Sequence, residues 1–192
     1  MEVSEAIKKY DPKRPYTYAD YITWEDDPRC ELIDGEVIVM EAPSIEHQRI
    51  SKKLFRQLDL FLEGKKCEVF YAPIDVCLSG KGDDDTTVVQ PDIVVICDHR
   101  ILDEKRCNGA PDFVIEILSP STKKYNKHQK MNKYMNAGVR EYWIVDPDSE
   151  TVAVHVFDRD NFFIGYYEYD ESVPVHVLGG FEISLRDVFK RI

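Results

Sequence analysis

Two apolar stretches decide the fold: VVQPDIVVIC at residues 88–97 and PDFVIEILSP at residues 111–120. Each carries a run of Val, Ile and Phe of strand length, which is typical of a strand buried on both faces. A proline removes a ladder hydrogen bond and tends to end or bulge a strand, so Pro91 is expected to aim Asp92 out of the sheet. The sequence therefore predicts two neighbouring strands that carry Asp92 and Glu116 near their ends.

The segments before these strands predict a hairpin and a long helix. An Asp-Gly pair interrupts the strand-forming residues of CELIDGEVIVM, which predicts strands at 31–33 and 36–40 joined by a tight turn. Apolar residues at helical spacing predict a helix over residues 44–62, closed by Gly64. The alternation of residues 67–78 predicts one further strand.

The segments after the two strands predict a lysine-rich helix and a set of later strands. The helix is expected from about residue 122 to residue 137. Further strands are expected at 141–146, 151–157, 162–169 and 173–177, with a short C-terminal helix. This order predicts an α/β fold of mixed α+β type, in which a mixed β-sheet is flanked by helices and carries extra β-hairpins. A lead-in of residues 1–15 and a single domain of residues 16–192 are expected.

Composition narrows the possible classes of protein. A net charge of -11 argues against nonspecific coating of nucleic acid, which depends on Lys and Arg. Residues 121–134 nevertheless carry five lysines and no acidic residue. Apolar runs are shorter than the roughly 18 residues of a membrane span, and the charged N-terminal segment does not resemble a secretory signal. A cytoplasmic protein with no membrane contact is expected.

The five cysteines predict no disulfide framework. Their number is odd and none lies closer than ten residues to the next, which excludes CxxC metal motifs. We expect reduced cysteines that serve as packing residues.

Two carboxylates and a lysine could form a metal-dependent hydrolytic site. Mg²⁺ and Mn²⁺ prefer oxygen ligands, and a cation can stabilise the charge that develops on a phosphate. Glu116 lies in FVIEIL, where a buried carboxylate is costly unless it is paired or binds a metal. The alternative readings are a turn acid for Asp92 and a solvated helix face for the lysines. Asp112, on the same strand face as Glu116 but at the strand start, is a second-rank candidate.

Five segments carry a resemblance to a known family: YTYADYI, ELIDGEVIVMEAPSIEHQRI, VVQPDIVVIC, APDFVIEILSPST and KMNKYMNAGVREYWIVDPDSETVAVHVF. In this order and spacing they resemble the PD-(D/E)XK nuclease superfamily, and within it the Uma-two family of restriction endonuclease-like proteins. The resemblance covers most of the chain. It implies a restriction-endonuclease-like core, DNA as substrate and a homodimer.

The resemblance also implies roles for individual residues. Asp92 and Glu116 are expected to be metal ligands. The superfamily pattern places a lysine two residues after Glu116, where this chain has Leu118. In the resembling family the lysine lies on the following helix, at the position of Lys130. Asn126 is a second departure, since the resembling family has an aspartate at this position.

Three more residues are accessory candidates. Lys127 is the alternative to Lys130, because a helical projection places it closer to the apolar face marked by Met131, Tyr134 and Met135. Glu31 resembles a recurrent acid before the hairpin, which either joins the metal site or caps a sheet edge. His47 resembles a histidine of the family's first long helix, where a surface or core-edge role is equally open.

The resulting hypothesis is a metal-dependent endonuclease. Asp92, Glu116 and the carbonyl of Ile117 would hold one Mg²⁺ or Mn²⁺, and Lys130 would stabilise developing charge during phosphodiester hydrolysis. The alternative is a catalytically inactive binding or assembly domain with a nuclease fold, which the negative charge, Leu118 and Asn126 favour.

Overall fold

The computed structural model describes residues 10–11, 13–24, 28–119, 127–157 and 162–190. The chain forms two compact units. Unit 1 comprises Met1–Ala42, Ile74–Gln90 and Arg100–Ala110, and unit 2 comprises Pro43–Pro73, Pro91–His99 and Pro111–Ile192. A single domain over residues 16–192 stays a prediction.

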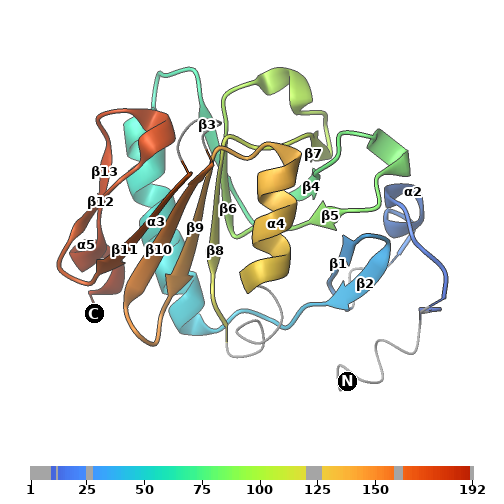
Figure 1. Cartoon of the computed structure of the whole chain (residues 1–192), viewed down its shortest axis with the longest axis horizontal. Coiled ribbons are helices and arrows are strands. Elements are labelled where there is room, and N and C mark those ends of the chain that lie inside the picture. The colour runs from blue at the N-terminus through green and yellow to red at the C-terminus, as the bar shows by residue number, and fades with distance from the viewer. Residues whose placement is uncertain (1–9, 12, 25–27, 120–126, 158–161, 191–192) are drawn as a thin grey trace. The chain divides into compact units, whose positions relative to one another are not determined.

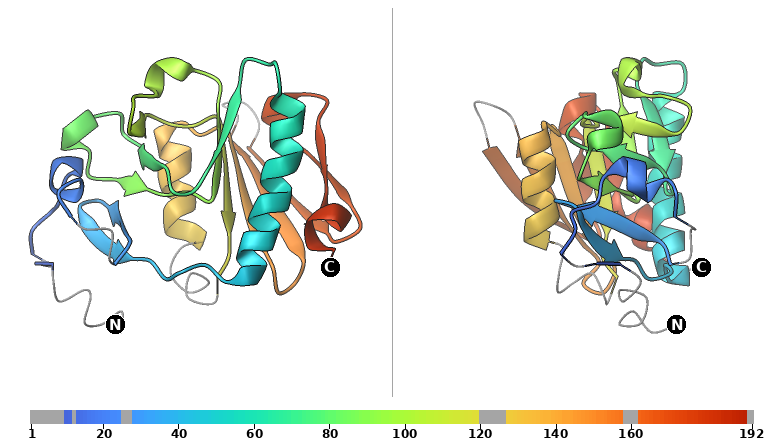
Figure 2. Two further views of the ribbon diagram at one scale, coloured as in Figure 1. Left: turned by 180° about the vertical axis from the view of Figure 1, so that it is seen from behind. Right: turned by 90° about the vertical axis from the view of Figure 1, so that its right-hand side faces the viewer.

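Unit 2 is built on a six-stranded sheet in the order β11-β10-β9-β8-β6-β3. β8 and β9 are parallel and every other neighbouring pair is antiparallel. Helices α3 and α4 cover opposite faces of this sheet (Figures 1 and 2). The strands are β3 (Glu68–Tyr71), β6 (Ile93–Ile96), β8 (Phe113–Ile117), β9 (Glu141–Asp146), β10 (Thr151–Phe157) and β11 (Phe162–Glu168).

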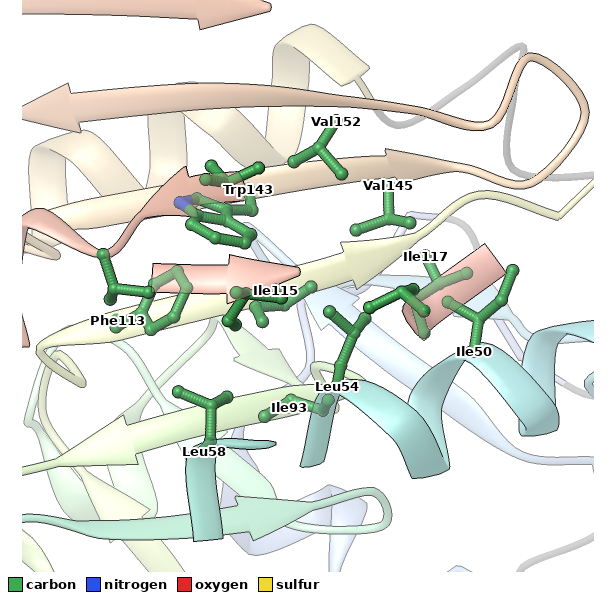
Figure 3. Packing of buried hydrophobic residues seen from close by; sticks show 14 of the residues in the cluster. Ile50, Leu54, Leu58, Ile93, Phe113, Ile115, Ile117, Trp143, Val145 and Val152 are labelled. Atoms are coloured by element: carbon green, nitrogen blue, oxygen red, sulfur yellow. The ribbon is translucent and has the colours of Figure 1, made fainter. Parts of the chain in front are cut away.

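Helix α3 (Ile45–Leu62) closes one face of the sheet with an apolar stripe. Ile50, Leu54 and Leu58 recur at helical spacing and are buried. Figure 3 shows this stripe directed at the sheet residues that carry the core. Ile93, Phe113, Ile115, Ile117, Trp143, Val145 and Val152 belong to the same buried cluster. The side chain of Ser44 caps the helix by accepting from the backbone N–H of His47 at 3.1 Å, so the helix begins where predicted.

The rest of unit 2 follows the predicted order with small changes. Helix α4 is Lys127–Ala137, and the predicted residues 122–126 lie outside the described residues. The C-terminal elements are β12 (Ser172–Pro174), the 3₁₀ helix η3 (His176–Leu178), β13 (Glu182–Ser184) and α5 (Leu185–Phe189). β12 and β13 form a two-stranded antiparallel sheet. The predicted strand at 173–177 is therefore shorter, because η3 replaces its second half.

Unit 1 contains a five-stranded sheet in the order β2-β1-β5-β4-β7. Asp34 (φ 54°) and Gly35 (φ 80°) form the two-residue turn between β1 and β2, in the conformation that the Asp-Gly pair predicts. The elements are α2 (Tyr18–Tyr21), β1 (Cys30–Ile33), β2 (Glu36–Val39), β4 (Asp75–Cys77), η1 (Gly82–Asp84), β5 (Val88–Val89), η2 (His99–Ile101) and β7 (Arg106–Asn108). The first residue of η2, His99, is the last residue of a unit 2 segment, and the rest of η2 belongs to unit 1.

One predicted strand is wrong. Residues 67–78 form two strands, β3 and β4, which belong to different sheets. Pro73 lies between them and has no backbone N–H to continue a ladder. The chain consequently leaves the six-stranded sheet at this proline and enters the five-stranded sheet.

The prediction of five reduced cysteines is also wrong. Cys67 and Cys97 form a disulfide, whereas Cys30, Cys77 and Cys107 are free and buried. The pairing of Glu68 with Ile96 in β3 and β6, continued by one residue, places Cys67 opposite Cys97. The bond thus follows from strand register, which a separation of 30 residues in the sequence does not reveal.

The mixed α+β prediction, with helices flanking mixed sheets, is confirmed. None of the described helices is both long and apolar enough to cross a membrane.

Candidate active site

Asp92 lies in the short segment between Pro91 and β6, where the sequence predicted that a broken strand would expose it. Its Oδ2 accepts a hydrogen bond from the backbone N–H of Ile117 at 2.7 Å. The same oxygen lies 3.2 Å from Nε2 of His47. The Asp92 carboxylate therefore contacts β8 directly after Glu116 and contacts α3 through its histidine.

Glu116 extends from β8 toward α4. Its Oε1 accepts hydrogen bonds from Nζ of Lys130 at 3.0 Å and from the hydroxyl of Tyr134 at 2.6 Å. Lys130 and Tyr134 are both buried, and they lie one helical turn apart on the same face of α4. A buried ammonium and a phenol therefore hold one oxygen of a strand carboxylate.

The strand register places Asp92 and Glu116 opposite each other. Ile93 pairs with Ile115 and Val94 pairs with Val114 in the antiparallel ladder of β6 and β8. Continuing this register by one residue puts Asp92 across from Glu116, a position at which Cβ atoms lie about 5 Å apart. Alternation along β8 puts Glu116 on the face opposite to Ile115, which is the α4 face, whereas Asp92 lies outside β6 and its carboxylate contacts His47 of α3.

His47 connects α3 with the candidate site. Burial lowers its pKa, but the hydrogen bond and charge of Asp92, together with the charge of Glu116, outweigh burial and raise the pKa above its ordinary value. Its Nδ1 is buried and has no hydrogen-bond partner among the described residues. The Asp92 carboxylate therefore favours the protonated form of His47.

The comparisons with known proteins identify the family and the fold. A family model described as "Uma2: Putative restriction endonuclease" matches residues 18–186. The chain belongs to the Uma2 family. The resemblance stated from the sequence is thereby confirmed.

Two curated relatives of this Uma2 chain come from Synechocystis sp. (strain ATCC 27184 / PCC 6803 / Kazusa). The uncharacterized protein slr1290 is 26% identical over 164 residues, which cover 83% of this chain and 84% of that protein. The uncharacterized protein sll1609 is 26% identical over 135 residues, covering 68% and 74% respectively. Their names assign no activity.

A solved structure shares the fold. It is a crystal structure described as a putative nuclease belonging to DUF820 from Anabaena variabilis ATCC 29413. The TM-score is 0.73 at 24% sequence identity, and the match covers 91% of this chain and 98% of the other. At this identity the likeness shows that the Uma2 chain has the same fold.

Tyr134 was not predicted as a functional residue of this Uma2 chain. In the sequence it served only to mark the apolar face of the helix. Its position four residues after Lys130 was the available signal, because such residues share a helix face. The projection placed Tyr134 correctly, since Tyr134 is fully buried, but it was wrong about Met135, which is 39% exposed, whereas Lys130 is 3% exposed. The buried face of α4 therefore contains Lys130 and Tyr134.

The accessory candidates occupy different surroundings. Asp112 Oδ2 accepts from the backbone N–H of Cys97 at 2.8 Å, and its Oδ1 lies 3.2 Å from the Arg140 guanidinium. Asp112 thus links the residue after β6 with the residue before β9 within unit 2. Glu31 belongs to unit 1, where it is buried in the inner strand β1 and accepts from the backbone N–H of Gln90 at 2.8 Å. The side chain of Lys127 lies outside the described residues.

The donor set suits a hard divalent cation. No group of three or more His, Cys, Asp or Glu side chains that could hold a metal ion occurs in the described part of the chain. Asp92 and Glu116 instead offer two carboxylates, with the Ile117 backbone between them. Mg²⁺ commonly binds one or two carboxylates and keeps several water ligands, so this set fits Mg²⁺ or Mn²⁺.

Proposed function

We propose that this chain is a metal-dependent endonuclease that hydrolyses phosphodiester bonds in DNA. The observation that supports the proposal is the register of β6 and β8, which continued by one residue sets Asp92 opposite Glu116, together with the ammonium group of Lys130 on Glu116. Membership of a family described as "Putative restriction endonuclease" supports the nucleic-acid substrate.

The proposed metal is Mg²⁺ or Mn²⁺, and its ligands would be Asp92, Glu116 and the carbonyl of Ile117. When bound, such an ion supplies Lewis-acid chemistry that polarises a phosphate and activates water. Lys130 orients Glu116 and places a positive charge where negative charge develops in the transition state. His47 holds Asp92 from the opposite helix.

Cleavage assays with purified protein test this proposal. We expect Mg²⁺- or Mn²⁺-dependent cleavage of supercoiled or single-stranded DNA, reduced roughly a thousandfold in Asp92→Ala and in Glu116→Ala. Glu182→Ala removes an exposed carboxylate from β13 and should cleave like the wild type. Equal cleavage by all four proteins would remove Asp92 and Glu116 from the site.

A second candidate function is a noncatalytic binding or assembly domain that keeps the nuclease fold. One specific observation favours it: Asp92 is paired with His47 and Glu116 is paired with Lys130, so each carboxylate already has a cationic partner. Leu118 also occupies the position where the superfamily pattern has lysine. Asn126, the other departure, lies outside the described residues.

Calorimetric titration with Mn²⁺ separates these two functions. An active site should bind Mn²⁺ and release the protons or cationic contacts that now neutralise its carboxylates. Glu116→Gln should abolish that binding, because the amide is a much weaker ligand for a hard cation. Absence of Mn²⁺ binding by the wild type would favour the noncatalytic domain.

A homodimer is also proposed, as the resemblance implies. β11 is the outer strand of the six-stranded sheet, and it exposes Phe162, Phe163, Ile164 and Tyr166. Exposed apolar side chains gathered on an edge strand are typical of association surfaces. Sedimentation velocity measures the oligomeric state directly.

A further inference from the structure

A groove of about 390 Å³ lies in unit 2 between the N-terminal half of α3 and β3. These two elements pack against each other, as the left view of Figure 2 shows. The groove combines apolar and cationic side chains. Those used below are Ile45, Arg49, Lys52, Phe55 and Tyr71.

The apolar part of the groove presents an aromatic ring to solvent. Tyr71 is 61% exposed at the end of β3, which is the outer strand on the side of the sheet opposite to β11. Phe55 meets the Tyr71 ring edge-on, with 4.9 Å between the ring centroids and 83° between the ring planes. This contact orients the tyrosine and leaves much of its surface accessible.

The cationic part of the groove is suited to phosphate. Lys52 is exposed, and among the described residues Arg49 makes only a surface ion pair, with Glu46 at 3.5 Å. Such exposed pairs contribute little, so the Arg49 guanidinium can exchange Glu46 for another anion. The net charge of the chain is -11, yet two cations lie here beside an exposed aromatic ring. Together they form a local site for an anionic ligand that also has a planar ring to stack.

The groove adjoins the candidate active site through its sheet wall. On the sheet side, Tyr71 pairs with Ile93, and the N–H of the next residue, Ala72, donates to the carbonyl oxygen of Asp92 at 3.0 Å. On the helix side, His47 contacts Asp92, but Arg49 lies half a helical turn away and points to a different face of α3, so this wall adds no contact with the site. A ligand in the groove would therefore lie close to the Asp92 segment.

We propose that this groove binds unpaired nucleotides of a DNA strand. A base stacks on Tyr71, while Arg49 and Lys52 hold the adjoining phosphates. Stacking needs a base with a free face, which a base inside a duplex does not offer, so the groove selects single-stranded or frayed DNA. This inference rests on the proposed nuclease function and names its preferred substrate.

Binding is measured without cleavage, so that the two proposals fail separately. A fluorescein-labelled oligothymidylate is titrated with the full chain in EDTA and followed by anisotropy. We expect Tyr71→Ala to weaken binding about tenfold and Tyr71→Phe to bind like the wild type, because stacking needs only the ring. Tyr169→Ala removes an exposed ring from the turn after β11, is the matched control and should bind normally.

Salt dependence tests the phosphate contacts. The logarithm of the association constant should fall less steeply with the logarithm of salt in Arg49→Ala and Lys52→Ala, by about 0.7 per lost contact on a single strand. Lys66→Ala removes an exposed lysine beyond the far end of α3 and should keep the wild-type slope.

Three results would overturn the inference. These are no binding of the oligonucleotide by the wild type, unchanged affinity in Tyr71→Ala, or a duplex of equal length that binds as tightly with the same dependence on Tyr71. If binding behaves as expected but metal-dependent cleavage is absent, the nuclease proposal fails and the groove assignment stands.

Discussion

Two glutamates on neighbouring strands of one sheet have different surroundings, and Glu116 is half-buried whereas Glu141 is fully buried. Glu116 lies near the end of β8 and accepts from the Lys130 ammonium. Glu141 lies at the start of the parallel strand β9, is fully buried, and accepts from Trp143 Nε1 at 2.7 Å and the backbone N–H of Val177 at 2.9 Å. The Glu116 carboxylate has a cationic partner and, by extension of the strand register, an aspartate opposite it. The Glu141 carboxylate is held mainly by neutral donors.

The comparison shows that a buried acid in a strand does not by itself mark an active site. Burial raises the pKa of Glu141 to about 7, although hydrogen bonds from Val177, Trp143 and His176 and the charge of Arg140 oppose the rise. Glu141 therefore anchors η3 to the sheet at an electrostatic cost. Glu116 differs in having a cationic partner, Lys130, to which the proposed chemistry assigns a role.

The largest expected effect comes from removing the cation that distinguishes Glu116 from Glu141. Lys130→Met keeps the length of the side chain and removes its charge. We expect the rate of DNA cleavage to fall roughly a thousandfold, about 4 kcal/mol of transition-state stabilisation, with the fold retained by circular dichroism. Lys66→Met, at an exposed site, should cleave normally. A wild-type rate in Lys130→Met would assign Lys130 a purely structural role.

The second prediction concerns stability and the pKa of Glu141. The folded chain holds the Glu141 proton up to a pKa of about 7, against an ordinary value of 4.5, so the folded state binds more protons between these pH values. Stability should therefore fall as pH rises from 4.5 to 7, by about 3 kcal/mol, and then level off.

Glu141→Gln isolates this contribution, because glutamine does not titrate. The wild-type free energy of unfolding minus that of Glu141→Gln, measured in urea at several pH values, should decrease across this window. The subtraction cancels the other titrating groups. A difference that is constant with pH would show that Glu141 ionises normally in the folded state.

Much of the fold could be predicted from sequence because its signals are local. The Asp-Gly turn, the stripe of α3 and the apolar runs of β6 and β8 each depend on residues close together in the chain. The split between β3 and β4 was missed, although Pro73 resembles Pro91 in its effect. Four of the five points at which the chain changes unit adjoin a proline: Pro43, Pro73, Pro91 and Pro111. Because proline ends a ladder of strand hydrogen bonds, these boundaries could have been predicted from the sequence.

Contacts between elements far apart in the chain explain what the sequence did not reveal. Asp92 and Glu116 were expected on neighbouring strands, but the atoms that hold them come from other elements. His47 reaches Asp92 from α3, and Tyr134 reaches Glu116 from α4. The Cys67–Cys97 disulfide likewise depends on how β3 pairs with β6. None of these contacts follows from the spacing of residues along one segment.

The smallest expected effect concerns Tyr134. Its hydroxyl is a neutral hydrogen-bond donor to Glu116, of the kind that also surrounds Glu141. Tyr134→Phe removes one hydroxyl and keeps a buried ring whose centroid lies 5.0 Å from that of Tyr142. Loss of a hydrogen bond to a charged group should lower stability by about 1–2 kcal/mol and slow cleavage about tenfold, because Glu116 is less firmly oriented. Tyr166→Phe makes the same change on the exposed strand β11 and should alter neither quantity. If Tyr134→Phe loses stability but cleaves at the wild-type rate, the hydroxyl supports packing alone, and Lys130 then suffices to set the Glu116 carboxylate apart from that of Glu141.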